Sequence, residues 1–427
     1  MPFPNGFQTS LPISKFQKPT RIMRSCSPIS PISRSHCALS LSLALAAGLI
    51  PASTYAAPFT WDSGGGTSSW GTGANWNPDG ASFNNTTDLT FAGTGSSTFT
   101  GIGTAGGTRT LRSITFNDSF TSTSGRIRYN SNGASGTSIA NNILFSSSTG
   151  TATISLTSGM TGSINMGSAG AAVFGETQLA SHLLISHAST SATLTISSNI
   201  TETVAARNIT KEGAGLAVFA NNNTYSGTTT VNGGTLRING THTGGGGYTV
   251  GVNGTLQGTG STNSALNVSG KLSPGASVQS FSSGALNMLT GSTFEYELNS
   301  SVGTSAGADL QVVSGNLNLS GTVSLTLANL AAIPTAFANG TTFSLINYSG
   351  AWNDGLFTIG GNAVADGGTF SAGLNVWEID YDAASGGLNF AGEHIAGGFV
   401  NITAVPEPHA VILGSIGAFA LLRRRRL

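Results

Sequence analysis

Charged residues and cysteines are both scarce in this sequence. Only 8% of the 427 residues are charged, against about a quarter in an average globular chain. The two cysteines, Cys26 and Cys37, both lie within the first 56 residues. The rest of the chain therefore has no disulfide, no thiolate metal site and no cysteine nucleophile, and we expect it to need no cofactor and no metal.

Basic residues are few between the two ends of the chain. Of the 17 lysines and arginines, five lie in residues 1–56 and four lie at Arg423, Arg424, Arg425 and Arg426. Residues 57–408 therefore keep 17 − 9 = 8 basic groups against 17 acidic ones, a net charge of about −9. Nucleic acids are bound through clustered lysine and arginine, so we expect no nucleic-acid partner.

The N-terminal segment has the features of a secretory signal. A basic region leads into the apolar run CALSLSLALAAGLI at 37–50, followed by Pro51 and by small residues at Thr54 and Ala56. This order predicts a signal peptide over 1–56 with a short apolar helix, cleaved after Ala56. Either Met1 or Met23 fits as the start of such a signal.

The exported body contains short segments in which apolar and hydroxyl residues alternate. Examples are TATISLT at 151–157, ATLTIS at 192–197, TFEYEL at 293–298 and TVSLTL at 322–327. A period of two with β-branched residues indicates strands with one buried face. Glycine, asparagine and serine, which favour turns, lie between them, so the sequence predicts an all-β fold.

A glycine that is followed two residues later by leucine recurs along the body, at 234–236, 254–256, 270–272 and 284–286. Such repetition is typical of a β-solenoid, in which each coil passes its strand to the next. We therefore predict a β-solenoid over 131–400, preceded by a tryptophan-rich cap with the first strands over 57–130. The alternative is a fold of β-sandwich domains.

The segment from Ile209 to Ile238 resembles the autotransporter-associated β-strand repeat. The residues that carry the resemblance are Lys211, Gly213, Gly215, Asn223, Tyr225, Gly227, Thr229, Gly234 and Leu236. Residues 272–275, 291–298, 309–312 and 340–348 also resemble segments of such proteins. The resemblance implies a passenger-like, right-handed parallel β-helix displayed outside the cell.

Three tryptophans, Trp61, Trp70 and Trp76, lie among glycine and asparagine at the start of the body. They resemble the tryptophan-rich opening of the same kind of protein. One interpretation is a cap, because the first coil of a stack has no neighbour to cover it. The other is a surface on which sugars stack.

The C-terminal segment VPEPHAVILGSIGAFALLRRRRL, 405–427, resembles the PEP-CTERM sorting signal of Gram-negative bacteria. Its parts are Pro406, Glu407 and Pro408, an apolar segment at 410–422 expected to be a transmembrane helix, and the four arginines, which resist translocation. The resemblance implies recognition by an exosortase, cleavage near Pro406 to Pro408, and transient anchoring in the inner membrane.

Other polar residues give weaker indications of chemistry. Glu295 and Glu297 lie two apart and so share one face of a strand, as glycosidase carboxylates can, but a solvated strand face is the simpler interpretation. His182 and His187 are five apart and fall on opposite faces. Asp380 and Asp382 could bind calcium, although no known calcium-binding pattern surrounds them.

The sequence as a whole predicts an exported, non-enzymatic surface or matrix protein. We expect its partners to be the secretion machinery and an exosortase, then an exopolysaccharide or the cell surface, where it would serve as structure or adhesin. The alternatives are a carbohydrate-binding module and a polysaccharide-degrading β-helix enzyme.

Overall fold

The computed structural model describes residues 58–407, apart from 63, 66–71, 82, 93–97, 100–106, 119, 121–123, 129, 133–137, 168–174 and 303–306. All described residues belong to one compact unit, Tyr55–Leu427. Several predicted features lie outside them: the leader over 1–56 with its helix, Trp70, Pro408, the apolar segment 410–422, and Arg423 to Arg426.

The described part of the chain is nearly all β, as the alternating pattern predicted. Its helical elements are two short 3₁₀ turns, η1 (Gly73–Asn75) and η2 (Ala391–Glu393), and it contains no α-helix. Among these residues no helix has the length and apolar character that a membrane crossing requires.

Most strands fall into three ladders of parallel pairs. The first ladder consists of β1 (Phe59–Trp61), β3 (Asp88–Phe91), β6 (Ser113–Phe116), β10 (Thr151–Leu156), β13 (His182–His187), β16 (Ile209–Glu212), β18 (Thr229–Ile238), β20 (Tyr248–Gly258), β22 (Leu266–Val268), β25 (Leu286–Met288) and β28 (Leu317–Leu319). The second consists of β4 (Thr98–Phe99), β7 (Ser124–Arg128), β11 (Ser163–Gly167), β14 (Thr193–Ile196), β17 (Leu216–Phe219), β18 and β20 again, β23 (Lys271–Pro274), β26 (Thr293–Leu298), β29 (Val323–Asn329) and β31 (Phe357–Ile359).

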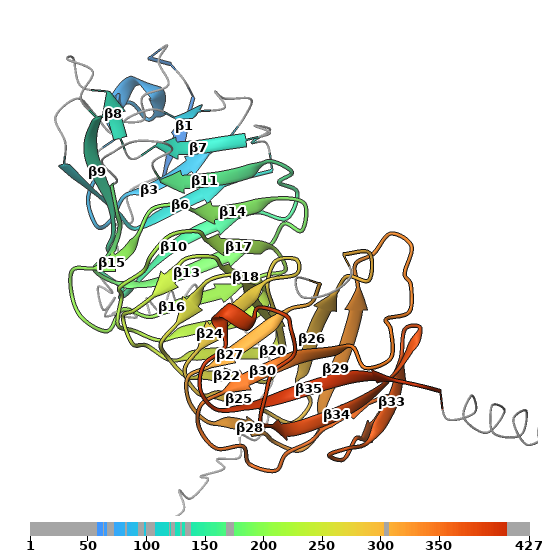
Figure 1. Ribbon diagram of the computed structural model, residues 1–427. Helices are drawn as coiled ribbons and strands as arrows, with labels where there is room; N and C mark the ends of the chain where they lie inside the picture. Colours follow the sequence, from blue (N-terminus) through green and yellow to red (C-terminus); the bar gives the residue numbers. More distant parts are fainter. Residues whose placement is uncertain are drawn as a thin grey trace, which may run out of the picture. The chain divides into compact units, whose positions relative to one another are not determined.

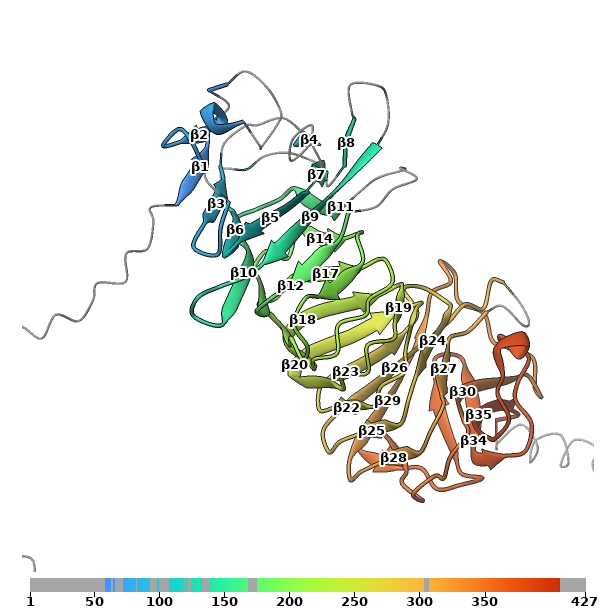
Figure 2. The same cartoon turned by 90° about the vertical axis from the view of Figure 1, so that its left-hand side faces the viewer.

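The third ladder has two parts. One is formed by β5 (Gly107–Leu111), β9 (Ser138–Phe145), β12 (Thr177–Leu179) and β15 (Ile200–Glu202), and the other by β19 (Thr241–His242), β21 (Ser261–Thr262), β24 (Ser280–Ser283), β27 (Leu310–Val313) and β30 (Thr342–Tyr348). The chain visits the ladders in turn, for example through β13, β14 and β15 and then β16 and β17. Figures 1 and 2 show the strands within a ladder following one another along the stack, for example β13, β16 and β18. Such parallel sheets are consistent with a β-solenoid.

Antiparallel pairing is found near both ends of the described chain. At the start, β2 (Trp76–Asn77) pairs with β1, and β8 (Asn130–Asn132) pairs with β9. After residue 341, β30, β35 (Gly398–Val405), β34 (Asn375–Ala383) and β33 (Thr369–Ala372) form an antiparallel sheet, and β32 (Asn362–Ala363) pairs with β31. Among the described strands, parallel pairing therefore begins with β1 and β3 and ends with β29 and β31.

The interior is filled by ladders of aliphatic side chains in register. One inward position runs from coil to coil as Ile114, Ile154, Ile185, Lys211, Val231, Val250, Val268, Met288 and Leu319. Each of these side chains is buried. Lys211 is the one charged member of the row, and it lies in the predicted repeat.

Candidate functional site

The repeat at 209–238 is built around Lys211, whose side chain is fully buried. Its Nζ donates to three carbonyl oxygens, those of Glu212 at 2.9 Å, Gly213 at 2.8 Å and Gly233 at 3.1 Å. An ammonium has three N–H donors, so the three carbonyls use all of them. Because Gly233 belongs to the next coil, Lys211 joins two coils.

Burial lowers the pKa of Lys211 to about 8, while the Glu212 carboxylate opposes the shift. The side chain therefore remains charged at neutral pH. A charged donor forms stronger hydrogen bonds than a neutral one. These bonds compensate for the aliphatic packing that the other residues of the same inward row provide.

Two glycines of the repeat lie where the backbones of neighbouring coils nearly touch. Gly213 has φ +75°, and a Cβ there would lie 2.4 Å from the carbonyl oxygen of His187. Gly234 has φ +61°, and its Cβ would lie 2.5 Å from the carbonyl oxygen of Gly213. A side chain at either position would be both strained and obstructed.

The same close contact explains the other two glycines of the motif. A Cβ at Gly215 would lie 1.9 Å from Nδ1 of His187, and one at Gly227 would lie 2.2 Å from the carbonyl oxygen of Arg207. Each coil thus leaves no room for a side chain where the next coil passes over it.

Asn223 fixes the corner of the coil. Its Oδ1 accepts from the backbone amide of Ile200 at 2.9 Å, and its backbone amide donates to the carbonyl of Thr241 at 2.8 Å. Ile200 lies one coil earlier and Thr241 one coil later. Asn223 therefore links three consecutive coils where a regular third-ladder strand is missing.

Tyr225 and Thr229 form the centre of a buried polar cluster. The Tyr225 hydroxyl and the Thr229 Oγ1 are 2.6 Å apart, and the Tyr225 ring stacks on His242 with centroids 4.1 Å apart. Nε2 of His242 lies 2.7 Å from the carbonyl oxygen of Tyr225, and its Nδ1 lies 2.8 Å from the Tyr248 hydroxyl. Because a carbonyl can only accept, Nε2 carries the proton and Nδ1 accepts from Tyr248.

The titratable groups of this cluster are neutral at physiological pH. Burial lowers the pKa of His242 and raises the pKa of Tyr225 to about 12.

The last motif residue, Leu236, is fully buried and in register with Ala217 and Leu256. The motif side chains, from Lys211 to Leu236, are thus occupied with contacts inside or between coils.

On the outer face of the first ladder, one uncharged polar side chain per coil lies in register. This polar ladder consists of Thr210, Thr230, Thr249, Asn267, Asn287 and Asn318. Asn287 donates to Asn267 at 2.9 Å and Asn318 to Asn287 at 2.6 Å. The amides are therefore held in fixed orientations, at the ~4.8 Å spacing of neighbouring strands.

Trp61 and Trp76 are buried in an aromatic cluster at the first coils. Their ring centroids are 5.2 Å apart at 86°, and Phe91 packs against both. Trp76 is 0% exposed and Trp61 4%. Neither indole presents a free face on which a sugar could stack.

Glu295 and Glu297 lie on the same half-exposed face of β26, while Phe294, Tyr296 and Leu298 are buried, as the alternation predicted. Glu295 accepts from Nζ of Lys271 at 2.8 Å. Burial, and then the charge of Glu295, raises the pKa of Glu297.

Sequence reasoning missed the buried carboxyl group beside this strand, that of Asp309. It is 0% exposed, and its oxygens accept from the amides of Gln279 at 3.0 Å and Glu297 at 2.9 Å. Burial raises the pKa of Asp309 to about 8. Its partners are 30 and 12 residues away, so no local pattern could have shown them.

The remaining predicted polar residues lie apart from the repeat. His187 is buried and His182 half-buried, on opposite faces of β13 as expected, and His182 accepts from the amide of Asn208. Carboxylate oxygens of Asp380, Asp382 and Asp366 lie within 4.8 Å of one another. Pro406 and Glu407 are exposed directly after β35.

The comparison with protein families bears on this coil. Residues 209–238 match the family model described as Passenger-associated-transport-repeat, which supports the repeat inferred from the motif. No curated protein matches the chain. A passenger-like β-repeat of this family suggests a secreted or surface protein.

Proposed function

We propose that this chain is an exported, non-enzymatic surface or matrix protein whose coils form a passenger-like, right-handed β-helix. The observation that carries the proposal is the use of the motif side chains in the repeat: Lys211, Asn223, Tyr225 and Thr229 all bond within or between coils. A coil of this kind supplies an extended scaffold and leaves its outer face for contact.

The C-terminal segment supplies the sorting signal in this proposal. Pro406 and Glu407 are exposed, and a proline pair keeps the chain extended, as a protease groove requires. An exosortase would cleave near Pro406 to Pro408, and Arg423 to Arg426 would hold the uncleaved tail on the cytoplasmic side.

Mass spectrometry of the mature termini tests the proposal. In a Gram-negative host with an exosortase, we expect ends near Ala57 and Pro408. In a host without the enzyme, and in the variant Glu407→Ala, the C-terminal tail should remain. The matched control is Glu393→Ala, an acidic residue outside the motif. An extracellular protein that retains Arg423 to Arg426 would show that the sorting assignment is wrong.

A second candidate function is carbohydrate binding, favoured by the polar ladder from Thr210 to Asn318. Hydroxyl and amide groups repeated once per coil could hydrogen-bond successive units of a neutral polysaccharide. Thr230→Val and Thr249→Val together should then weaken binding to a neutral polysaccharide, and Thr193→Val, on another ladder, should not. Sugar release abolished by Glu295→Gln would instead support an enzyme.

A further inference from the structure

Exposed apolar side chains are unevenly distributed over the described residues. Four of them, Leu330, Ile333, Leu374 and Leu388, are 40%, 82%, 61% and 65% exposed. They lie on three segments, 330–341, 373–375 and 386–388, which are far apart in sequence. We call this group the exit surface, because the segments meet where β35 leaves the domain.

Hydrogen bonds place two of the three segments, 330–341 and 373–375, beside the end of β35. Val376 pairs with Val405, the last residue of that strand, and the turn that carries Leu374 directly precedes β34. Figure 1 shows β33 and β34 beside β35. The amide of Gly340 donates to the carbonyl of Ala404 at 2.7 Å. Asn375 exchanges two hydrogen bonds with the backbone of Phe337, each of 2.9 Å.

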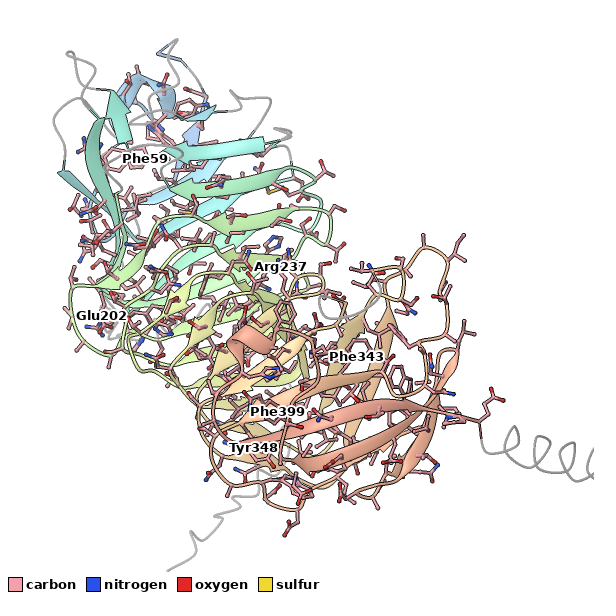
Figure 3. The ribbon with its side chains drawn as sticks, in the orientation of Figure 1. Phe59, Glu202, Arg237, Phe343, Tyr348 and Phe399 are labelled. Carbon is pink, nitrogen blue, oxygen red and sulfur yellow. The ribbon has the colours of Figure 1, made fainter. Side chains whose placement is uncertain are left out.

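Leu388 joins the group across a cavity of about 590 Å³. Its walls include Gly340, Thr342, Phe343 and Gly387 as well as Leu388, and Phe343 is labelled in Figure 3. The cavity therefore lies directly beside the strand pair that leads to the C-terminal segment.

The exit surface carries no charge. Residues 330–343, 372–375 and 384–390 contain no acidic or basic residue, and no lysine or arginine occurs between Lys271 and Arg423. These residues are therefore unsuited to bind phosphate or another anion. Exposed leucine and isoleucine on uncharged loops suit the interface of a lipid bilayer.

The length of chain after β35 limits the distance between this surface and a membrane. Four residues, 406–409, separate Val405 from Ala410, where the apolar segment begins. The five steps from one Cα to the next, at ~3.6 Å each, span at most about 18 Å. If residues 410–422 enter the bilayer, as the proposed sorting function requires, the end of β35 must lie within that distance of it.

We propose that the exit surface rests on the lipid interface while the C-terminal segment is still attached, and so holds Pro406 to Pro408 at membrane level. The inference depends on the proposed function, because it needs the apolar segment in the membrane. The exit surface would then be a second membrane attachment beside the apolar segment 410–422. A second attachment matters because a single short anchor holds a protein to a membrane only weakly.

Depth-dependent quenching in uncharged phosphocholine vesicles tests this proposal. The full chain, with Cys26 and Cys37 replaced by serine, receives one cysteine at a time for an environment-sensitive fluorophore. Ile333→Cys and Leu374→Cys probe the exit surface. Ser415→Cys probes the apolar segment, and Val252→Cys, at a side chain 76% exposed on the coils, is the matched control.

We expect a quencher in the lipid headgroup region to reduce fluorescence at 333 and 374 at least twofold and at 252 hardly at all. Raising the salt concentration should not change this, because apolar contact is not screened. Quenching by lipid at 415 without quenching at 333 and 374 would overturn the inference and leave the sorting function standing. Absence of quenching at 415 would overturn both, and self-quenching at 333 without vesicles would assign the surface to a second copy.

Discussion

The coils around residues 209–283 and the strands after residue 341 bury their interiors by different means. In the coils, parallel strands stack aliphatic side chains in register, such as Val231, Val250 and Val268. Buried rings such as Tyr225 and Tyr248 are fewer there than after residue 341. In that part, antiparallel strands enclose rings, with Phe343 and Trp377 packed 6.1 Å apart and Tyr381 stacked 5.1 Å from Trp352. A coil in the middle is covered by its neighbours, whereas the last coil needs bulky groups to replace the missing one.

The first coils follow the same rule as the last. Trp61, Trp76 and Phe91 cluster there, and β2 pairs antiparallel with β1. Large rings bury much area per residue, so a few of them close an open end. The comparison suggests that the stability of the ends depends on aromatic residues and that of the middle on aliphatic ones. Substitutions can test this.

The largest effect is expected from Trp377→Ala at the C-terminal end. Trp377 is 1% exposed, and truncating a buried tryptophan costs about 4 kcal/mol of unfolding free energy. Hydrogen exchange should show faster exchange over 342–405 with the coils at 209–283 still protected. The control is Leu256→Ala, in the middle of the stack, which should loosen the coils first. If both variants lose protection everywhere at once, the two regions do not differ as we infer.

The second prediction separates close backbone contact from conformational strain. Gly234 and Gly373 have nearly equal φ angles, +61° and +62°, but only Gly234 has backbone atoms where a Cβ would lie. Gly373→Ala should cost about 1–2 kcal/mol, for the left-handed conformation alone. Gly234→Ala should cost about 3 kcal/mol or more, because neighbouring coils must move apart.

Urea unfolding of the two glycine variants gives the measurement. Equal losses would mean that coil spacing adapts to a methyl group, contrary to the dense packing of the repeat. A loss at Gly234 that appears only in the coils by hydrogen exchange would sharpen the contrast with the C-terminal strands.

The third prediction compares the two lysines of the described chain. Lys211→Met should cost roughly 2 kcal/mol, because the carbonyls of Gly213 and Gly233 lose a charged donor. Lys271→Met should cost less than about 1 kcal/mol, since its pair with Glu295 lies at the surface, with the Lys271 side chain 38% exposed. Thermal unfolding of both variants measures the difference, and a Lys211 variant as stable as the Lys271 variant would contradict the interior link.

The strands and their buried faces could be predicted from the sequence, but the contacts between residues far apart in the chain could not. Alternation gave the strands, and in ITKE at 209–212 it also places Lys211 on the same inward face as Ile209. The carbonyl of Gly233 that Lys211 reaches is set by coil length, which no local pattern specifies. The same holds for Asp309, whose amide partners come from Gln279 and Glu297, and for Asn389, which bonds Tyr296 and Ser344 from a distant loop.

Changes of stability with pH give the last comparison, and they should have opposite signs at two buried groups, His187 and Asp309. Burial, and then the charge of Lys211, lowers the pKa of His187 to about 4. The unfolded chain then binds a proton that the folded coil does not, so stability should fall as pH drops from 6.5 toward 4, by about 3 kcal/mol. Burial raises the pKa of Asp309 to about 8, so the folded form keeps the proton longer and stability should fall as pH rises from about 4 to 8.

Two variants assign these slopes to their residues. His187→Phe should remove the acid-side loss and leave the slope between pH 4 and 8. Asp309→Asn should be less stable overall, because its NH₂ would face a backbone amide, but its stability should vary less between pH 4 and 8. Hydrogen exchange at pH 5 and pH 8 locates each change, with the coils affected at low pH and residues around 309 at high pH. If one variant removed both slopes, the two groups would have to be coupled, and the parallel coils from 187 to 309 would then titrate as one unit.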